Sequence, residues 1–85
     1  MWMRYIRPHE GDPMNRNDWF TMRTEEAADG AVTLVLIDHP AGTKGDLTRA
    51  SMTPSEARTM ADEIAADLLA DGWTLEADHL HHADW

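Results

Sequence analysis

The segment 53–72 constrains the fold more than any other, because it carries the signals for both ends of a helix. Thr53 is a suitable N-cap, Pro54 suits the first helical position because its missing N–H would have no helical partner, and Glu56 completes a capping box. Gly72 provides a left-handed stop after the last turn. We therefore predict one helix over residues 53–72.

Hydrophobic periodicity indicates how this helix packs. Apolar residues recur along it at spacings of three and four: Ala57, Met60, Ala61, Ile64, Ala65, Leu68 and Leu69. The carboxylates of the segment fall outside this stripe: Glu56, Asp62, Glu63, Asp67 and Asp71. An amphipathic helix buries its apolar stripe against the rest of the domain and exposes its polar face. The sequence therefore predicts an acidic outer surface on the helix.

Strand-like patterns occupy most of the remaining chain. They are found at residues 2–7, 19–24, 31–38, 46–52 and 73–77. The strongest is V-T-L-V-L-I at residues 32–37, which is apolar on both faces. Such a strand is expected in the centre of a sheet that is covered on both sides. We expect the helix on one side, and either the N-terminal segment or a second subunit on the other.

These elements predict an α+β fold, in which an antiparallel sheet of three to four strands carries one long amphipathic helix on one face. A length of 85 residues permits one domain with one modest core. The expected parts of the single domain 1–85 are a loop at 8–18, strands within 19–52, the helix at 53–72, a candidate last strand at 73–78 and a tail at 79–85. Trp19 and Trp73 lie in strand-like segments, where we expect them to be buried.

The chain is strongly acidic, and the charge is unevenly distributed. The formal net charge is −9, of which residues 53–85 contribute −7, because Arg58 stands alone there against eight carboxylates. Such a surface repels nucleic acids and anionic membranes and attracts a basic protein surface. The chain has no cysteine and no long apolar segment, so we expect a soluble cytoplasmic protein without a cofactor.

The hairpin, the short strand and the helix that follow one another between Val32 and Gly72 resemble a pattern found in small uncharacterised proteins of actinobacteria and their phages. The resemblance rests on V-T-L-V-L-I and on M-T-P-S-E-A-R at residues 52–58. It implies a small accessory or phage-encoded domain, and it assigns no catalytic residue to this chain.

Tryptophan and arginine near the N-terminus predict a binding surface. Trp2 lies close in sequence to Arg4, Tyr5 and Arg7, and tryptophan, tyrosine and arginine are common at the energetic centres of protein interfaces. An exposed edge strand at 2–7 would bind a second copy or a host protein through these side chains. The acidic helix face would add electrostatic attraction to a partner with a basic surface.

Two other functions are compatible with the sequence. Glu63, Asp67 and Asp71 are spaced four residues apart, about 6 Å between neighbours along a helix, so this acidic row can imitate the phosphates of DNA. Imidazole side chains bind transition metals when no thiolate is present. The candidate ligands of such a site are His79, His81 and His82, with His9, His39 or Asp84 as a further ligand.

Catalytic motifs are weak in this chain. Ser51 and Ser55 lack the G-x-S-x-G setting, and the segment 42–45 (G-T-K-G) lacks the spacing of a phosphate-binding loop. The neighbouring residues Asp38 and His39 are more typical of the end of a strand than of a catalytic acid–base pair. The sequence therefore predicts a non-catalytic protein-interaction domain, with a DNA mimic and a histidine-based metal-binding protein as the alternatives.

Overall fold

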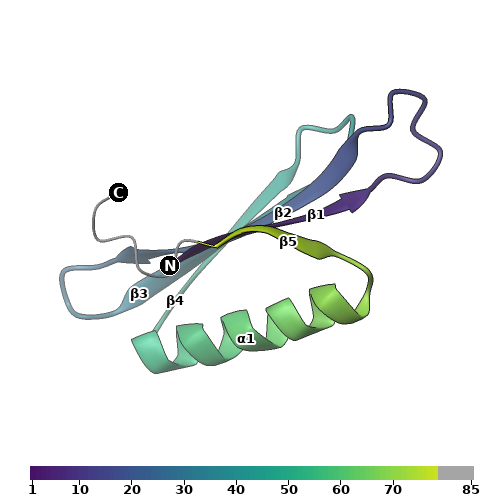
Figure 1. Ribbon diagram of the computed structural model, residues 1–85. Helices are drawn as coiled ribbons and strands as arrows, with labels where there is room; N and C mark the ends of the chain where they lie inside the picture. Colours follow the sequence, from purple (N-terminus) through teal and green to yellow (C-terminus); the bar gives the residue numbers. More distant parts are fainter. Residues whose placement is uncertain (79–85) are drawn as a thin grey trace.

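A computed structural model describes residues 1–78 as five strands and one helix (Figure 1). The elements are β1 (Trp2–Pro8), β2 (Asn17–Glu26), β3 (Val32–His39), β4 (Asp46–Met52), α1 (Pro54–Ala70) and β5 (Thr74–Asp78). The α+β class with one helix is confirmed. The sheet has five strands rather than the expected three to four, because the first and the last strand-like segments both join it.

All neighbouring strands are antiparallel, and their order across the sheet is β4-β3-β2-β1-β5. Three hairpin connections place β1 to β4 side by side, whereas β5 returns to the outer side of β1. Arg4 therefore has a partner on each side, Thr21 in β2 and Ala77 in β5. The expectation that residues 2–7 form an exposed edge strand is wrong, and the two edges of the sheet are β4 and β5.

The first hairpin is longer than the sequence indicates. Arg7 pairs with Asp18, and Pro8 pairs with Asn17, so strand pairing continues into the segment that we expected to be a loop at 8–18. Polar residues are tolerated at this end of the hairpin because cross-strand hydrogen bonds satisfy the backbone there. The connection between β1 and β2 is accordingly confined to residues 9–16.

Both predicted ends of α1 are present. At the N-terminus the Thr53 hydroxyl accepts the Glu56 N–H at 3.1 Å, and the Glu56 carboxylate accepts the Thr53 N–H at 3.0 Å, which completes the capping box. At the C-terminus Gly72 has a φ of +91°. The Trp73 N–H donates to the Leu68 carbonyl at 3.0 Å, and the Gly72 N–H donates to Leu69. These two bonds form a Schellman motif, which stops the helix and turns the chain towards β5.

The helix crosses the sheet from one edge to the other, since it connects β4 with β5 (Figure 1). Its 17 residues span about 26 Å at 1.5 Å per residue. The outer strands of a five-stranded sheet lie about 19 Å apart at about 4.8 Å per strand. The length of α1 is therefore what a diagonal crossing of this sheet requires.

The core lies between α1 and one face of the sheet. Its buried members come from β1, β2, α1 and the residue just before β5: Met3, Tyr5, Met22, Ala61, Leu68 and Trp73. Small side chains at Ala57 and Ala61 allow the helix backbone to approach the strands closely. The N-terminal segment does not cover the second side of β3, as one of our expectations had it, because it is itself a strand within the sheet.

Candidate protein-docking surface

Side-chain alternation along the strands divides the sheet into two faces. Met3, Tyr5 and Met22 point towards α1 and pack in the core. The residues between them point the other way, onto a surface that we call the helix-free face, because no other helix or strand within residues 1–78 lies over it (Figure 1). Its members are Trp2, Arg4, Ile6, Trp19, Thr21, Arg23, Glu25, Thr33, Val35, Ile37, His39, Leu47 and Arg49.

Apolar side chains form the middle of the helix-free face. Val35 is 0% exposed, and Ile37 next to it is half-buried. Leu47 in the edge strand β4 is 50% exposed, and Trp19 in β2 is 40% exposed. The expected burial of Trp19 is thus only partial, because its strand position directs it away from α1. Contiguous apolar groups on a solvent-facing sheet are typical of binding surfaces.

Arg4 lies between two tryptophans on this face. Its guanidinium carbon is 4.8 Å from the centroid of Trp2 and 4.5 Å from that of Trp19. Cation–π contacts of this kind contribute about 0.5–2 kcal/mol each. Trp19 also meets the ring of His39 edge-on, with centroids 6.3 Å apart. The contact of Arg4 with Glu76 is long, at 4.0 Å, so stacking rather than ion pairing orients this guanidinium.

A second charged group lies nearer the other end of the face. Glu25 pairs with Arg23 at 3.3 Å and with Arg49 at 3.2 Å. The Glu25 carboxylate therefore forms ion pairs with two guanidinium groups. The Nε–H groups of Arg4 and Arg23 are buried and have no acceptor within the described part of the chain. Buried donors without an acceptor are costly.

The residues that the sequence assigns to the interface do not share one surface. Trp2 and Arg4 lie on the helix-free face, as described above. Tyr5 is buried in the core beneath α1, where a docking protein cannot contact it. Arg7 also lies on the helix side, where it pairs with Asp71 at 3.3 Å and stacks over the ring of Trp73 at 4.5 Å. Strand alternation explains the division, since neighbouring positions of β1 point to opposite faces.

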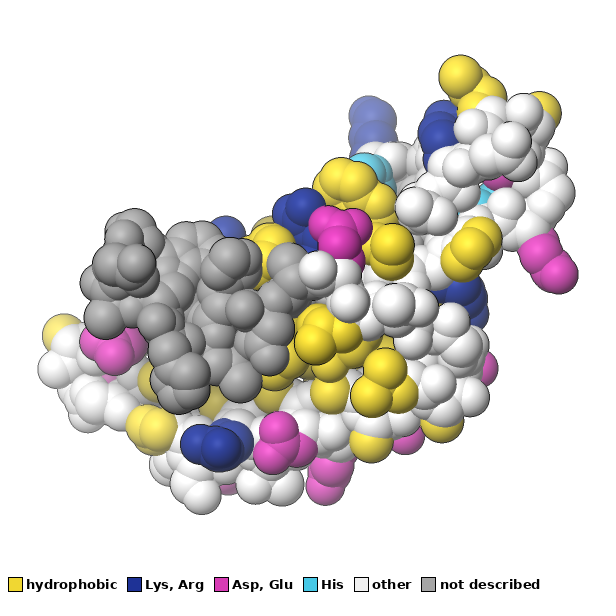
Figure 2. All heavy atoms as spheres, in the orientation of Figure 1, with side chains coloured by type: hydrophobic (Ala, Val, Ile, Leu, Met, Phe, Trp, Pro, Cys, Tyr) yellow, Lys and Arg dark blue, Asp and Glu magenta, His cyan; other side chains and the backbone are white. Residues whose placement is uncertain are grey.

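The acidic residues of α1 gather on the other side of the molecule, along the lower edge in Figure 2. Glu63 and Asp67 are exposed there, whereas Asp62, which is also exposed, lines a groove between α1 and the sheet. Glu56 is also exposed, but its carboxylate is occupied by the capping box, and this hydrogen bond with the Thr53 backbone lowers the pKa of Glu56. Asp71 is the C-cap of the helix and pairs with Arg7. The acidic and the tryptophan-rich parts of the predicted interface are thus on opposite sides of the sheet.

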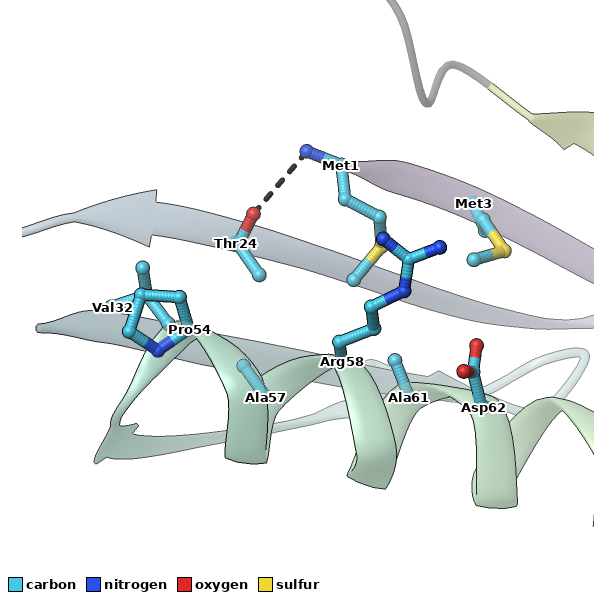
Figure 3. A pocket seen from close by; sticks show the side chains of 9 residues that line it. All are labelled: Met1, Met3, Thr24, Val32, Pro54, Ala57, Arg58, Ala61 and Asp62. Carbon is cyan, nitrogen blue, oxygen red and sulfur yellow. Dashed lines mark hydrogen bonds between the residues drawn. The ribbon is translucent and has the colours of Figure 1, made fainter.

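A shallow groove of about 350 Å³ runs between the first half of α1 and the ends of β1, β2 and β3 (Figure 3). Met1, Met3 and Val32 form its apolar floor. Arg58 and Asp62 rise from the helix towards it, and the N-terminal amino group donates to Thr24 Oγ1 at 3.2 Å. The helix and the sheet therefore do not pack closely against each other along this groove.

Two buried carboxylates organise the loops at the far end of the sheet, and sequence analysis missed both. Asp12 accepts Arg16 Nε at 2.9 Å and Nη2 at 3.2 Å, as well as the Arg16 backbone N–H at 2.8 Å. Asp18 accepts His9 Nδ1 at 2.7 Å and the Ala41 N–H at 2.8 Å, which joins the first and third connections. The available signal was an Asp four residues before an Arg, which is too common in loops to single out.

The pKa of both carboxylates lies below the ordinary value of 3.8. For Asp12 the chief cause is the side-chain hydrogen bond with Arg16. Burial alone would raise the pKa of Asp18, but the hydrogen bonds from Ala41 and His9 outweigh it. The folded state therefore binds fewer protons near pH 4 than the unfolded state does, and it loses stability as the pH falls from about 4 through the lowered values.

We expect the urea midpoint of the wild type to fall steadily between about pH 4.5 and pH 2. Asp12→Asn and Asp18→Asn should be less stable than the wild type at pH 7, because each removes one buried acceptor oxygen. Their urea midpoints should also fall less than that of the wild type on acidification. Urea titrations at several pH values check this. Parallel acid profiles for the wild type and both variants would contradict it.

A metal site receives no support from the described residues. Within residues 1–78, no three His, Cys, Asp or Glu side chains are grouped so as to hold an ion. His9 donates to Asp18, and His39 Nε2 donates to the Thr43 carbonyl at 2.7 Å, so both candidate further ligands already have hydrogen-bond partners. The remaining candidates, His79, His81, His82 and Asp84, lie outside the described residues, as does the tail 79–85 as a whole.

No protein-family model matches this sequence, and neither the curated proteins nor the solved structures include one that is significantly similar to it. The resemblance to actinobacterial and phage proteins therefore stays a prediction. Within residues 1–78, no helix is long and apolar enough to cross a lipid bilayer.

Proposed function

We propose that this chain is a non-catalytic protein-interaction domain that binds its partner on the helix-free face. The main support is the combination of Trp19, Arg4 and Leu47 on a sheet face that no other described element covers. Apolar residues on both sides of β3 are expected where both sides of a sheet are covered. Within residues 1–78, only one side of the sheet is covered by another element. A second protein surface would cover the other side.

The charges on this face favour a particular kind of partner. Arg4, Arg23 and Arg49 outnumber the carboxylates of Glu25 and Glu76 that pair with them. A segment that offers both apolar side chains and carboxylates would fill the apolar centre and accept hydrogen bonds from the arginines. A partner with a basic surface, which the total charge favours, would instead meet α1 on the opposite side.

The geometry supports the alternative of DNA mimicry less well. Mimicry requires a continuous row of exposed charges, and the row predicted on α1 consists of Glu63, Asp67 and Asp71. Arg7 approaches Asp71 to 3.3 Å and partly neutralises the end of the row. Two adjacent free carboxylates on a helix are common on soluble proteins, so docking on the helix-free face is the preferred function.

Site-specific photo-cross-linking tests the docking surface. A benzophenone amino acid replaces Leu47 in one variant and Leu69 in a second, and both are irradiated in a lysate of cells that express the chain. The two positions form a matched pair, because Leu47 is 50% exposed on the helix-free face and Leu69 is 56% exposed on α1. We expect discrete covalent adducts from position 47 and none from position 69.

Mass spectrometry of the adducts identifies the partner, and a product of twice the chain's mass would identify it as a second copy. Trp19→Ala combined with the probe at position 47 should reduce the yield of the adduct at least severalfold, since tryptophans at interface centres contribute strongly to binding. Equal adducts from both positions, or none from either, would overturn the proposal.

A further inference from the structure

A polar hollow of about 460 Å³ opens where the connections β1–β2 and β3–β4 approach each other, next to the end of the helix-free face. It shares Trp19 and His39 with that face, whereas Leu47 does not line it. The residues that line it are Asn15, Arg16, Asn17, Trp19, His39, Ala41, Gly42 and Thr43. The two connections and the strands β2 and β3 thus each contribute to its walls.

The walls of the hollow are held in place by hydrogen bonds beneath them. Asp12 binds both the side chain and the backbone of Arg16, while Asp18 binds the backbone of Ala41, as described above. His39 is fixed by its bond to the Thr43 carbonyl. Gly45 has a φ of +79°, and a Cβ there would lie 2.9 Å from the His39 ring. A ligand would therefore meet loops that are already ordered, which lowers the entropic cost of binding.

The polar groups of the hollow that have no hydrogen-bond partner indicate which kind of ligand would fit it. The side-chain amides of Asn15 and Asn17 and the indole N–H of Trp19 form no hydrogen bond within residues 1–78. A primary amide offers a donor and an acceptor side by side. The charge of Arg16 is balanced by Asp12 at 2.9 Å, which offsets the attraction of Arg16 for an anionic group. The hollow is suited to a neutral ligand with adjacent donors and acceptors along one edge.

Trp19 adds a flat apolar surface. Arg4 stacks over its ring at 4.5 Å and pairs in the sheet with Thr21, two residues after Trp19. Asn17, which lines the hollow, lies two residues before Trp19 on the same strand face. The Trp19 side chain therefore borders both Arg4 and the hollow. The guanidinium lies over the ring, and in our proposal the ligand stacks on the opposite face.

We propose that this hollow binds a neutral nucleobase, which stacks on Trp19 and forms paired hydrogen bonds with the amide of Asn17. A purine has a flat face for the indole, and the N6 amino group and N7 of adenine present the adjacent donor and acceptor that an asparagine amide complements. Stacking of a base on an aromatic side chain and paired hydrogen bonds with its edge make contributions of similar size. The acidic face of α1 lies on the other side of the sheet and does not line this site.

Adenosine is the probe for this site, titrated into the isotopically labelled full chain and followed by two-dimensional NMR of the amide and indole N–H groups. We expect saturable shifts at the Trp19 indole and at the backbone of residues 15–17 and 39–43. Trp19→Ala should weaken binding about tenfold or more. Trp2→Ala is the matched control, because Trp2 contacts the same arginine outside the hollow.

Asn17→Ala is a second test for the case in which Trp19→Ala impairs folding. Asn17 is exposed at the end of β2, so its truncation should leave the fold intact. We expect this variant to bind adenosine severalfold more weakly, while its NMR spectrum stays as well dispersed as that of the wild type. Glucose and ribose are titrated in parallel, and binding of either sugar as tightly as adenosine would overturn the assignment to a base. So would an absence of saturable shifts with adenosine, or equal losses in Trp2→Ala and Trp19→Ala.

Discussion

Met22→Ala is expected to lower the free energy of unfolding by about 2–5 kcal/mol. Met22 is 0% exposed and lies in β2 with Met3 and Leu36 as its cross-strand neighbours, at the centre of the face that α1 covers. Truncation leaves a cavity that neither the strands nor the helix can close without losing other contacts. Domains of this size have little stability in reserve, so this loss is a large fraction of the total.

Urea denaturation followed by circular dichroism measures this change. Met14→Ala is the matched control, because Met14 is 71% exposed in the β1–β2 connection and should change the free energy of unfolding by less than about 0.5 kcal/mol. If the two methionine variants had similar stabilities, the placement of the core on this side of β2 would be incorrect.

Trp73→Ala is expected to cost about 3–5 kcal/mol. The indole is buried behind the Schellman motif, meets the ring of Phe20 at 6.4 Å and lies under the guanidinium of Arg7 at 4.5 Å. It therefore fixes the C-terminal end of α1 to the sheet. The variant should lose helical signal at a lower urea concentration than the wild type, and Trp73→Phe should retain part of the stability because it keeps an aromatic ring on Phe20.

Comparison with Trp19→Ala separates this effect from a general requirement for tryptophan. Trp19 is 40% exposed on the helix-free face, so its removal should cost clearly less than the removal of Trp73 in dilute solution. Equal losses in the two variants would mean that Trp73 does not anchor the helix as the structure indicates.

The helix was predictable because its signals are local. Thr53, Glu56 and Gly72 act within one turn of the helix ends, and the observed capping box and Schellman motif use them as expected. The strand-like segments were also recognisable from their composition. Their order was not, because no short-range pattern states that the last strand pairs with the first. That pairing placed β1 inside the sheet instead of at its edge.

The candidate surface was predictable only in part, for a similar reason. Sequence composition singled out Trp2 and Arg4, but it grouped them with Tyr5, which points to the opposite face. The role of Trp19 depends on which side of β2 receives the helix, and this is decided by contacts with residues some forty positions away. The buried carboxylates Asp12 and Asp18 were missed because their partners come together only when the two connections meet.

The position of β5 has a consequence for the way in which this chain folds. Strands β1 to β4 can pair in sequence through short connections, which close at low entropic cost. The pairing of Met3 with Asp78, in contrast, joins opposite ends of the described chain and must wait until α1 has crossed the sheet. Until then β1 is an unpaired strand edge that can associate with other chains. The arrival of β5 covers that edge, so we expect the β1–β5 pairing to lower the tendency of the chain to aggregate.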